Sequence, residues 1–137
     1  MTENTSAATY KRVFLVDGHS YLYRAFYATP HLSNSRGVPT NAIYAFVSMI
    51  RKLASSENPD TLIVVFDSRG PSFREEISRE YKAQRPAMPD NLSLQVPFVK
   101  QIIDAMGLPV VEKEGFEADD IIATITEHLR TRDDVMT

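Results

Sequence analysis

The segment VFLV at residues 13–16 is a short apolar run that is followed at once by Asp17. Unbroken runs of β-branched and aromatic residues are typical of strands that are covered on both faces, as in parallel sheets. Two further runs have this form: residues 61–66 (TLIVVF) end at Asp67, and residues 108–111 (LPVV) lead through a turn to an acidic cluster. The sequence therefore predicts three parallel strands, each followed by acidic residues.

The stretches between these runs have helical periodicity. Apolar residues spaced three and four apart predict helices over residues 20–28, from Thr40 to about Ser55, from Asp90 to Met106 and over residues 118–130. Thr40 and Asp90 are residue types that cap helices. We expect Pro97 to kink the third helix or to shift its start. Strands that alternate with helices predict an α/β fold with a parallel sheet and right-handed crossovers.

The composition is that of an ordinary soluble domain. The chain has 137 residues, of which 43% are hydrophobic and 24% charged, and it has no cysteine. Disulfide frameworks and thiolate metal sites are therefore excluded. Residues 1–12 lack the apolar core of a secretory signal, and no apolar run is long enough to span a membrane. We expect a cytoplasmic protein in which residues 1–10 form a flexible tail.

Charge is distributed unevenly along the chain. The net charge of −3 argues weakly against nucleic-acid binding, yet residues 69–85 carry five basic and three acidic side chains. Residues 114–134 carry seven acidic and two basic side chains. A metal-dependent phosphodiesterase needs a basic segment and an acidic cluster. Solvated surface charge would give the same counts, so the charges alone leave both interpretations open.

The placement of the acidic residues is more informative. The carboxyl ends of parallel strands share one edge of the sheet, where ligands of open α/β sheets bind. We expect Asp17, Asp67 and the cluster of Glu117, Asp119 and Asp120 to meet at that edge. Converging carboxylates repel each other unless a cation lies between them. With oxygen ligands alone, the expected ion is Mg²⁺ or Mn²⁺.

Each of these residues has a simpler explanation when it is taken alone. An acidic residue after a strand often caps a helix, and the helix dipole favours acidic residues in a first turn. Only the three segments together indicate a metal site. His19 is interpreted as a local hydrogen-bonding residue, and the aromatic residues at positions 21, 23, 26 and 27 are interpreted as packing.

The segment Ser68–Arg85 (SRGPSFREEISREYKAQR) combines cations with an aromatic ring. Arg74, Lys82 and Arg85 could reach phosphates, and Tyr81 could stack on an unpaired base. A solvated surface helix with charge pairs one turn apart is the alternative.

Four blocks now stand in series: VFLVDGHSYLYRAFYA, NSRGVPTNAIYAF, VVFDSRGPSFREEISREYKAQRPAMPD and GFEADDIIATI. In order and spacing they resemble the 5′-nuclease domain of bacterial DNA polymerase I, the bacterial branch of the flap endonucleases. The resemblance covers about residues 13–130. It implies a Rossmann-like (PIN-type) α/β sheet flanked by helices, with a partly helical basic arch over about residues 69–89. Residues 11–137 would then be the N-terminal portion of a 5′-3′ exonuclease domain.

The resemblance also implies an activity. Members of this family are two-metal, Mg²⁺-dependent (or Mn²⁺-dependent) 5′-3′ exonucleases and flap endonucleases, which hydrolyse DNA with 5′ ends or 5′ flaps in replication and repair. The loop Asn34–Thr40 resembles one that leads to a helix wedged against the duplex. By position, the resemblance assigns metal binding and catalysis to Asp17, Asp67, Glu117, Asp119 and Asp120, catalytic support to Lys82 and Arg85, and DNA binding to Arg24, Arg74, Tyr81, Lys82 and Arg85.

Two departures from the family pattern bear on these expectations. His19 stands where the family usually has a small polar residue, and the family pattern continues beyond Thr137 with a strand that carries two more Asp residues. We therefore expect the second metal site to be incomplete and a sheet edge to be exposed for self-association. The alternative function is a non-catalytic DNA-binding fragment that retains a partial metal site. A Mg²⁺-dependent phosphatase is less well supported, because no acidic residue follows Asp17 at the second position.

Overall fold

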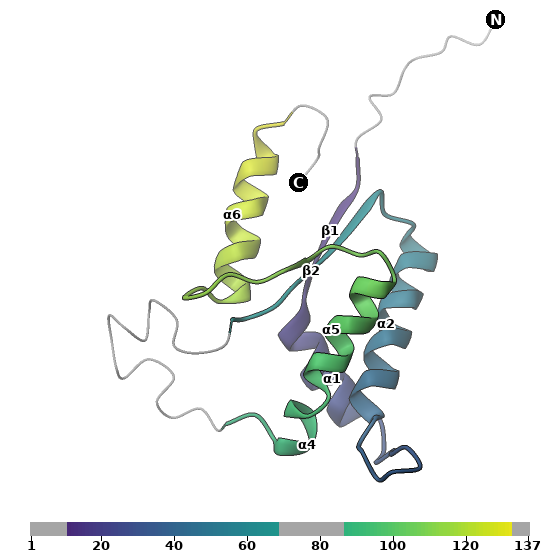
Figure 1. Cartoon of the computed structure of the whole chain (residues 1–137). Coiled ribbons are helices and arrows are strands. Elements are labelled where there is room, and N and C mark those ends of the chain that lie inside the picture. The colour runs from purple at the N-terminus through teal and green to yellow at the C-terminus, as the bar shows by residue number, and fades with distance from the viewer. Residues whose placement is uncertain (1–10, 69–86, 133–137) are drawn as a thin grey trace, which may run out of the picture.

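A parallel sheet of three strands lies at the centre of the computed structural model, which describes residues 11–68 and 87–132. β1 (Val13–Asp17) pairs with β2 (Thr61–Val65), and β2 pairs with β3 (Val110–Val111), so the strand order is β1-β2-β3. The predicted α/β fold is confirmed (Figure 1). The predicted tail and residues 69–86 of the predicted arch lie outside the described residues.

The strand ends differ slightly from those predicted. Asp17 is the last residue of β1 rather than the residue after it, and β2 ends one residue before Phe66. β3 has only two residues. Pro109 has no N–H to donate to a strand ladder, although its carbonyl accepts a bond from the backbone N–H of Val64 at 3.0 Å.

Among the described residues, five helices connect or follow these strands: α1 (Gly18–Ala28), α2 (Asn41–Glu57), α4 (Asp90–Ser93), α5 (Val96–Ala105) and α6 (Ala118–Arg130). The helix predicted from Asp90 is divided in two. Pro97 lies in the first turn of α5, where its missing N–H is not needed, so the predicted shift of the helix start is confirmed. In the described part of the chain, none of the helices has both the length and the apolar character that a bilayer span requires.

The predicted helix caps are confirmed only in part. Thr40 occupies the N-cap position of α2, as predicted, but its side chain makes no capping bond. Instead, Oε1 of Gln95 accepts the backbone N–H groups of Ala42 and Ile43. Asp90 is the first residue of α4 rather than its cap. A cap supplied by a residue that is distant in sequence leaves no local sequence signal.

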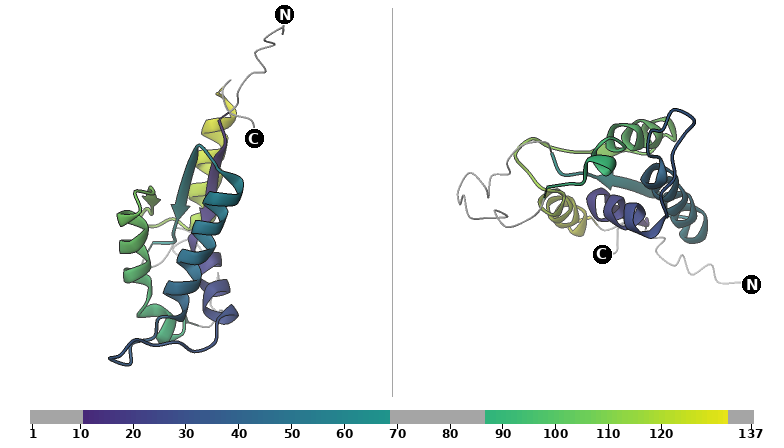
Figure 2. Two further views of the ribbon diagram at one scale, coloured as in Figure 1. Left: turned by 90° about the vertical axis from the view of Figure 1, so that its right-hand side faces the viewer. Right: turned by 90° about the horizontal axis from the view of Figure 1, so that it is seen from below.

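The sheet is covered on both faces. Alternate side chains of β2 point to opposite sides: Leu62 and Val64 join the main core, whereas Ile63 and Val65 face α6. α1, α2 and α5 contribute to the main core, and α6 lies on the other side of the strands (Figures 1 and 2). This arrangement brings the turn after β1 and the start of α6 to the same edge of the sheet.

Close packing fixes the turn between β1 and α1. A Cβ atom on Gly18 would lie 2.6 Å from Cε1 of Phe66, which is closer than carbon atoms approach each other. Glycine at this position therefore lets the start of α1 rest on the Phe66 ring.

Candidate functional site

Asp17 ends β1 and caps α1. Its Oδ1 accepts the backbone N–H of Ser20 at 3.3 Å, and its Oδ2 accepts the Ser20 hydroxyl at 2.9 Å. In the register of the sheet Asp17 lies opposite Val65, two residues before Asp67. The first two predicted carboxylates therefore belong to neighbouring strands at the same edge.

Asp67 connects the two sides of this edge. Its Oδ1 accepts the backbone N–H of Ala118 at 2.5 Å, which satisfies a free donor at the start of α6. Its Oδ2 lies 3.7 Å from Nδ1 of His19, in the turn after β1. This distance exceeds that of a hydrogen bond, so the pair attracts electrostatically only when the imidazole is protonated. Asp67 thus meets two segments that are remote in sequence.

The third group of carboxylates opens α6 with a reciprocal capping box. Glu117 is buried, and its side chain accepts the backbone N–H of Asp120. Oδ2 of Asp120 in turn accepts the backbone N–H of Glu117 at 3.1 Å. Asp119, between them, is exposed. Acidic groups in a first turn are also stabilised by the helix dipole.

The predicted carboxylates therefore share an edge without forming a cage. Within residues 11–68 and 87–132, no three His, Asp or Glu side chains stand close enough together to hold a metal ion. Asp17, Asp67, Glu117 and Asp120 each accept a backbone N–H at a helix start. The helix-capping explanation of these residues is thus borne out, and their predicted metal binding remains a prediction.

The DNA-binding predictions fall mostly outside the described residues, because Arg74, Tyr81, Lys82 and Arg85 all lie within 69–86. Arg24 is exposed on α1, with its guanidinium 5.7 Å from the centre of the Tyr21 ring. It stands seven residues beyond Asp17, about two helical turns.

A row of rings along α1 was not predicted. His19, Tyr23 and Tyr27 are spaced four residues apart, and successive ring centres are 6.1 and 6.4 Å apart. The packing interpretation holds for Tyr21, Tyr23 and Phe26, which pack against the main core, whereas Tyr27 is 69% exposed. The spacing of four residues between these rings could have predicted the row, because such residues lie on the same side of a helix.

The negative charge of Asp67 affects the pKa of one ring in this row. Burial raises the pKa of Tyr23 above its ordinary value, and the nearby Tyr27 and the negative charge of Asp67 raise it further. The phenol therefore keeps its proton at neutral pH and remains a hydrogen-bond donor.

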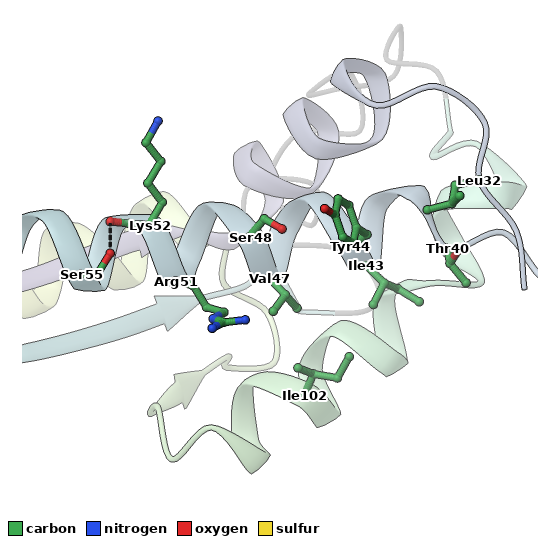
Figure 3. A pocket seen from close by; sticks show the side chains of 10 residues that line it. All are labelled: Leu32, Thr40, Ile43, Tyr44, Val47, Ser48, Arg51, Lys52, Ser55 and Ile102. Atoms are coloured by element: carbon green, nitrogen blue, oxygen red, sulfur yellow. Dashed lines mark hydrogen bonds between the residues drawn. The ribbon is translucent and has the colours of Figure 1, made fainter.

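Cavities lie beside α6 and along α2. One of about 340 Å³ is lined by Val111 of β3, by Lys113 and Phe116 of the turn that follows, and by Asp120, Ile121, Thr124 and Ile125 of α6. A groove of about 720 Å³ runs along α2 (Figure 3). Its lining consists of Leu32, Thr40, Ile43, Tyr44, Val47, Ser48, Arg51, Lys52, Ser55 and Ile102.

Comparison with known proteins identifies the family. The model of the 5′-3′ exonuclease N-terminal resolvase-like domain matches residues 12–137. This chain belongs to that family. The predicted resemblance to the 5′-nuclease domain of bacterial DNA polymerase I is thereby confirmed.

Relatives in this 5′-3′ exonuclease family are longer than the chain. The 5′-3′ exonuclease of Aquifex aeolicus is 47% identical over 117 residues, which are 85% of this chain and 40% of that protein. DNA polymerase I of Caldicellulosiruptor bescii is 46% identical over 119 residues, which are 87% of this chain and 14% of that protein. The chain therefore spans well under half the length of either relative.

A solved structure supports the fold. The flap endonuclease of bacteriophage T5, in a pseudo-enzyme–product complex with DNA and metal ions, matches with a TM-score of 0.54 and 27% identity. The match covers 86% of this chain and 44% of that one. The Rossmann-like arrangement of sheet and helices is thus shared with a nuclease that binds metal ions and DNA.

Proposed function

We propose that this chain forms part of a 5′-3′ exonuclease or flap endonuclease that hydrolyses DNA phosphodiesters in replication and repair. The observation that carries the proposal is the position of Asp67, whose carboxylate meets the start of α6 at Ala118 and faces His19 beyond β1. A carboxylate at the meeting point of three segments, in a chain of this family, favours a metal-dependent reaction at that edge.

The donor atoms at this edge fit Mg²⁺ or Mn²⁺. They are all carboxylate oxygens, and the Asp67 side chain is 27% exposed, so water can share its coordination. The residues that would hold the ion, directly or through water, are Asp17, Asp67, Glu117, Asp119 and Asp120.

When bound, such an ion would polarise the phosphodiester and make its coordinated water more acidic. The chain itself would orient the carboxylates through helix starts: Asp17 on α1, and Asp67 with the Glu117–Asp120 capping box on α6. Lys82 and Arg85 would stabilise negative charge on the scissile phosphate. Arg24 and Arg74 would bind other phosphates, and Tyr81 would stack on an unpaired base.

The proposed partner is DNA with a 5′ end or a 5′ flap, which places the protein in the cytoplasm with its substrate. We also propose self-association through a sheet edge, since β1 and β3 are each paired with only one of the described strands. A rise in mass with concentration by light scattering would support this association, and a constant monomer mass would exclude it.

The central test is cleavage of a 5′-labelled flap substrate with Mg²⁺ by the wild type and by Asp67→Asn. Asparagine keeps an oxygen that can accept the Ala118 N–H but removes the charge that an ion requires. We expect cleavage to fall by at least roughly tenfold, the lower range of losses on disturbing a metal site.

Asp104→Ala is the matched control, because it also removes one negative charge, from an exposed position on α5. It should cleave at the wild-type rate. Equal rates for the wild type and Asp67→Asn would remove Asp67 from the mechanism.

A second function, DNA binding without catalysis, is favoured by the lack of a three-ligand cluster within the described residues. Calorimetric titration of Mg²⁺ and the flap assay on the 137-residue chain separate the two. Binding of Mg²⁺ and DNA without turnover would favour the second function, whereas cleavage that depends on Asp67 would exclude it.

A further inference from the structure

Two buried amide side chains join helices that are distant in sequence. Asn41 is 5% exposed and Gln95 is fully buried. Nε2 of Gln95, in the break between α4 and α5, donates to Oδ1 of Asn41, the first residue of α2, at 2.9 Å. Buried polar groups are costly unless they are bonded, so such a pair is under strong geometric constraint.

The Gln95 side chain makes three further hydrogen bonds, two with the start of α2 and one with α4. Its Oε1 accepts the backbone N–H groups of Ala42 at 2.8 Å and Ile43 at 3.1 Å, which caps α2. Its Nε2 also donates to the carbonyl of Asn91 in α4 at 2.8 Å. The amide therefore holds the start of α2 against the turn that precedes α5.

Asn41 extends this network to α1. Its Nδ2 donates to the carbonyl of Phe26 at 3.0 Å and to that of Thr29 at 3.4 Å. These carbonyls stand at the end of α1, where no helical partner is available to them. The Asn41–Gln95 pair thus fixes the end of α1 and the start of α2 relative to each other.

The chain between these two helix ends, residues 29–40, forms a small ordered hairpin. Ser33 and Pro39 form an antiparallel bridge, and Oδ1 of Asn34 accepts the backbone N–H groups of Arg36 at 2.9 Å and Val38 at 3.0 Å. Gly37 adopts a φ of +79°, which favours glycine. The turn holds itself together, so the direction in which it projects depends on its two anchored ends.

The surface around this hairpin suits an anion. No Asp or Glu occurs between Asp17 and Glu57, although the whole chain has a net charge of −3. Arg36 is exposed at the hairpin tip. The groove that begins at Leu32 and Thr40 continues along α2 to Arg51 and Lys52 and is lined by no carboxylate (Figure 3). A groove whose lining carries two cations and no carboxylate, together with the exposed arginine of the hairpin, matches a phosphate backbone.

We propose that Gln95 is a positioning residue for the duplex part of a branched DNA: through Asn41 and the start of α2 it fixes the direction of the hairpin 29–40. Since α1 has eleven residues, about 16 Å of rigid helix separates this anchor from Asp17. The hairpin would then hold the duplex at a set distance from the carboxylate edge. This inference rests on the proposed function.

The test compares Gln95→Met, which keeps the length of the side chain but loses the amide, with the wild type. Fluorescence anisotropy, without added metal, measures the Kd for a 5′-flap duplex and for a single strand of the same length. We expect the flap Kd to rise about tenfold, because the four hydrogen bonds of the amide are lost and the direction of the hairpin is no longer fixed, and the single-strand Kd to stay unchanged. With Mg²⁺, KM should rise and kcat should not change.

Gln101→Met is the matched control, because it makes the same substitution at an exposed position on α5. It should behave as the wild type. Asn41→Asp is the second variant: it keeps the oxygen that faces Gln95 but loses the donor to Phe26 and Thr29, and it should also raise the flap Kd. If Gln95→Met does not fold, Asn41→Asp decides the question.

A purely structural role would lower the unfolding midpoint of these variants while leaving the ratio of the two Kd values at its wild-type level. That result would overturn the inference, as would a wild type that binds the flap duplex no more tightly than the single strand. A wild type that binds the flap duplex but never cleaves it would contradict the proposed function alone. The Kd ratio would still test Gln95 in that case.

Discussion

The two faces of the sheet are held by different forces. On one face, α1, α2 and α5 enclose a core that includes Phe46, Ile50 and Val64, all fully buried. On the other face, the buried residues in the described part of the chain are Val65, Ala118 and Ile121. Partly buried apolar side chains pack against these three, and the Asp67–Ala118 bond ties the start of α6 to the residue that follows Phe66.

Asp67, one of the proposed metal ligands, therefore also anchors the start of α6. In the main core, a helix keeps its position through the burial of apolar side chains. Substitutions at Asp67 should disturb both the proposed metal site and the docking of α6, whereas substitutions in the main core should chiefly lower stability.

The largest loss of stability should follow substitutions on the face of the sheet that is covered by α1, α2 and α5. Phe46→Ala removes a fully buried ring and should lower the free energy of unfolding by about 3–5 kcal/mol. Ile121→Ala, on the α6 side, should cost about 2 kcal/mol, because the residue is 9% exposed and has fewer neighbours to lose. Urea unfolding measures both, and equal losses would contradict the contrast between the faces.

A smaller loss of stability is expected at the turn between β1 and α1, where Gly18 rests on the Phe66 ring. Gly18→Ala places a methyl group 2.6 Å from the Phe66 ring and should cost about 1–3 kcal/mol. Phe66→Leu reduces the ring to a smaller group, so the double variant should lose less stability than the sum of the single variants. Strict additivity of the two losses would show that the contact does not constrain Gly18.

Asp67→Ala should loosen α6 locally. Loss of the capping bond to Ala118 should cost about 1 kcal/mol and speed hydrogen exchange of the first turn of α6 about fivefold. Asp17→Ala removes a comparable cap from α1, but burial of Leu22 and Ala25 should limit the change in exchange there. If α1 opened as readily as α6, the proposed difference in anchoring would be wrong.

The smallest effect concerns pH. The pKa of Tyr23 is raised in the folded state, first by burial, then by Tyr27 and Asp67. The folded protein holds this proton more tightly, so the associated stability is present below the unfolded pKa of about 10 and is lost as pH rises through the folded pKa. Ultraviolet titration of tyrosinate, with Tyr23→Phe subtracted, measures the shift.

Asp67→Asn supplies the control for that titration. Removing the negative charge should lower the pKa of Tyr23 relative to the wild type, although burial keeps it above the ordinary value. An identical pKa in both proteins would place the charge of Asp67 out of reach of the ring.

Much of the fold could be predicted from local patterns. Apolar runs placed β1 and β2 to within one residue, and the spacing of Ile121, Ile122 and Ile125 placed α6 at residues 118–130. Pro97 gave the start of α5. These features depend on apolar periodicity and proline geometry, and both can be recognised in short stretches of sequence.

Sequence alone also determined which acidic residues follow the strands, and the family to which the motifs belong. Tertiary structure alone decided that Asp67 caps α6 rather than its own segment, and that Gln95 rather than Thr40 caps α2. Both bonds join residues about fifty positions apart. Local propensity cannot specify such pairs, because a backbone N–H donates to any acceptor oxygen that packing brings within reach.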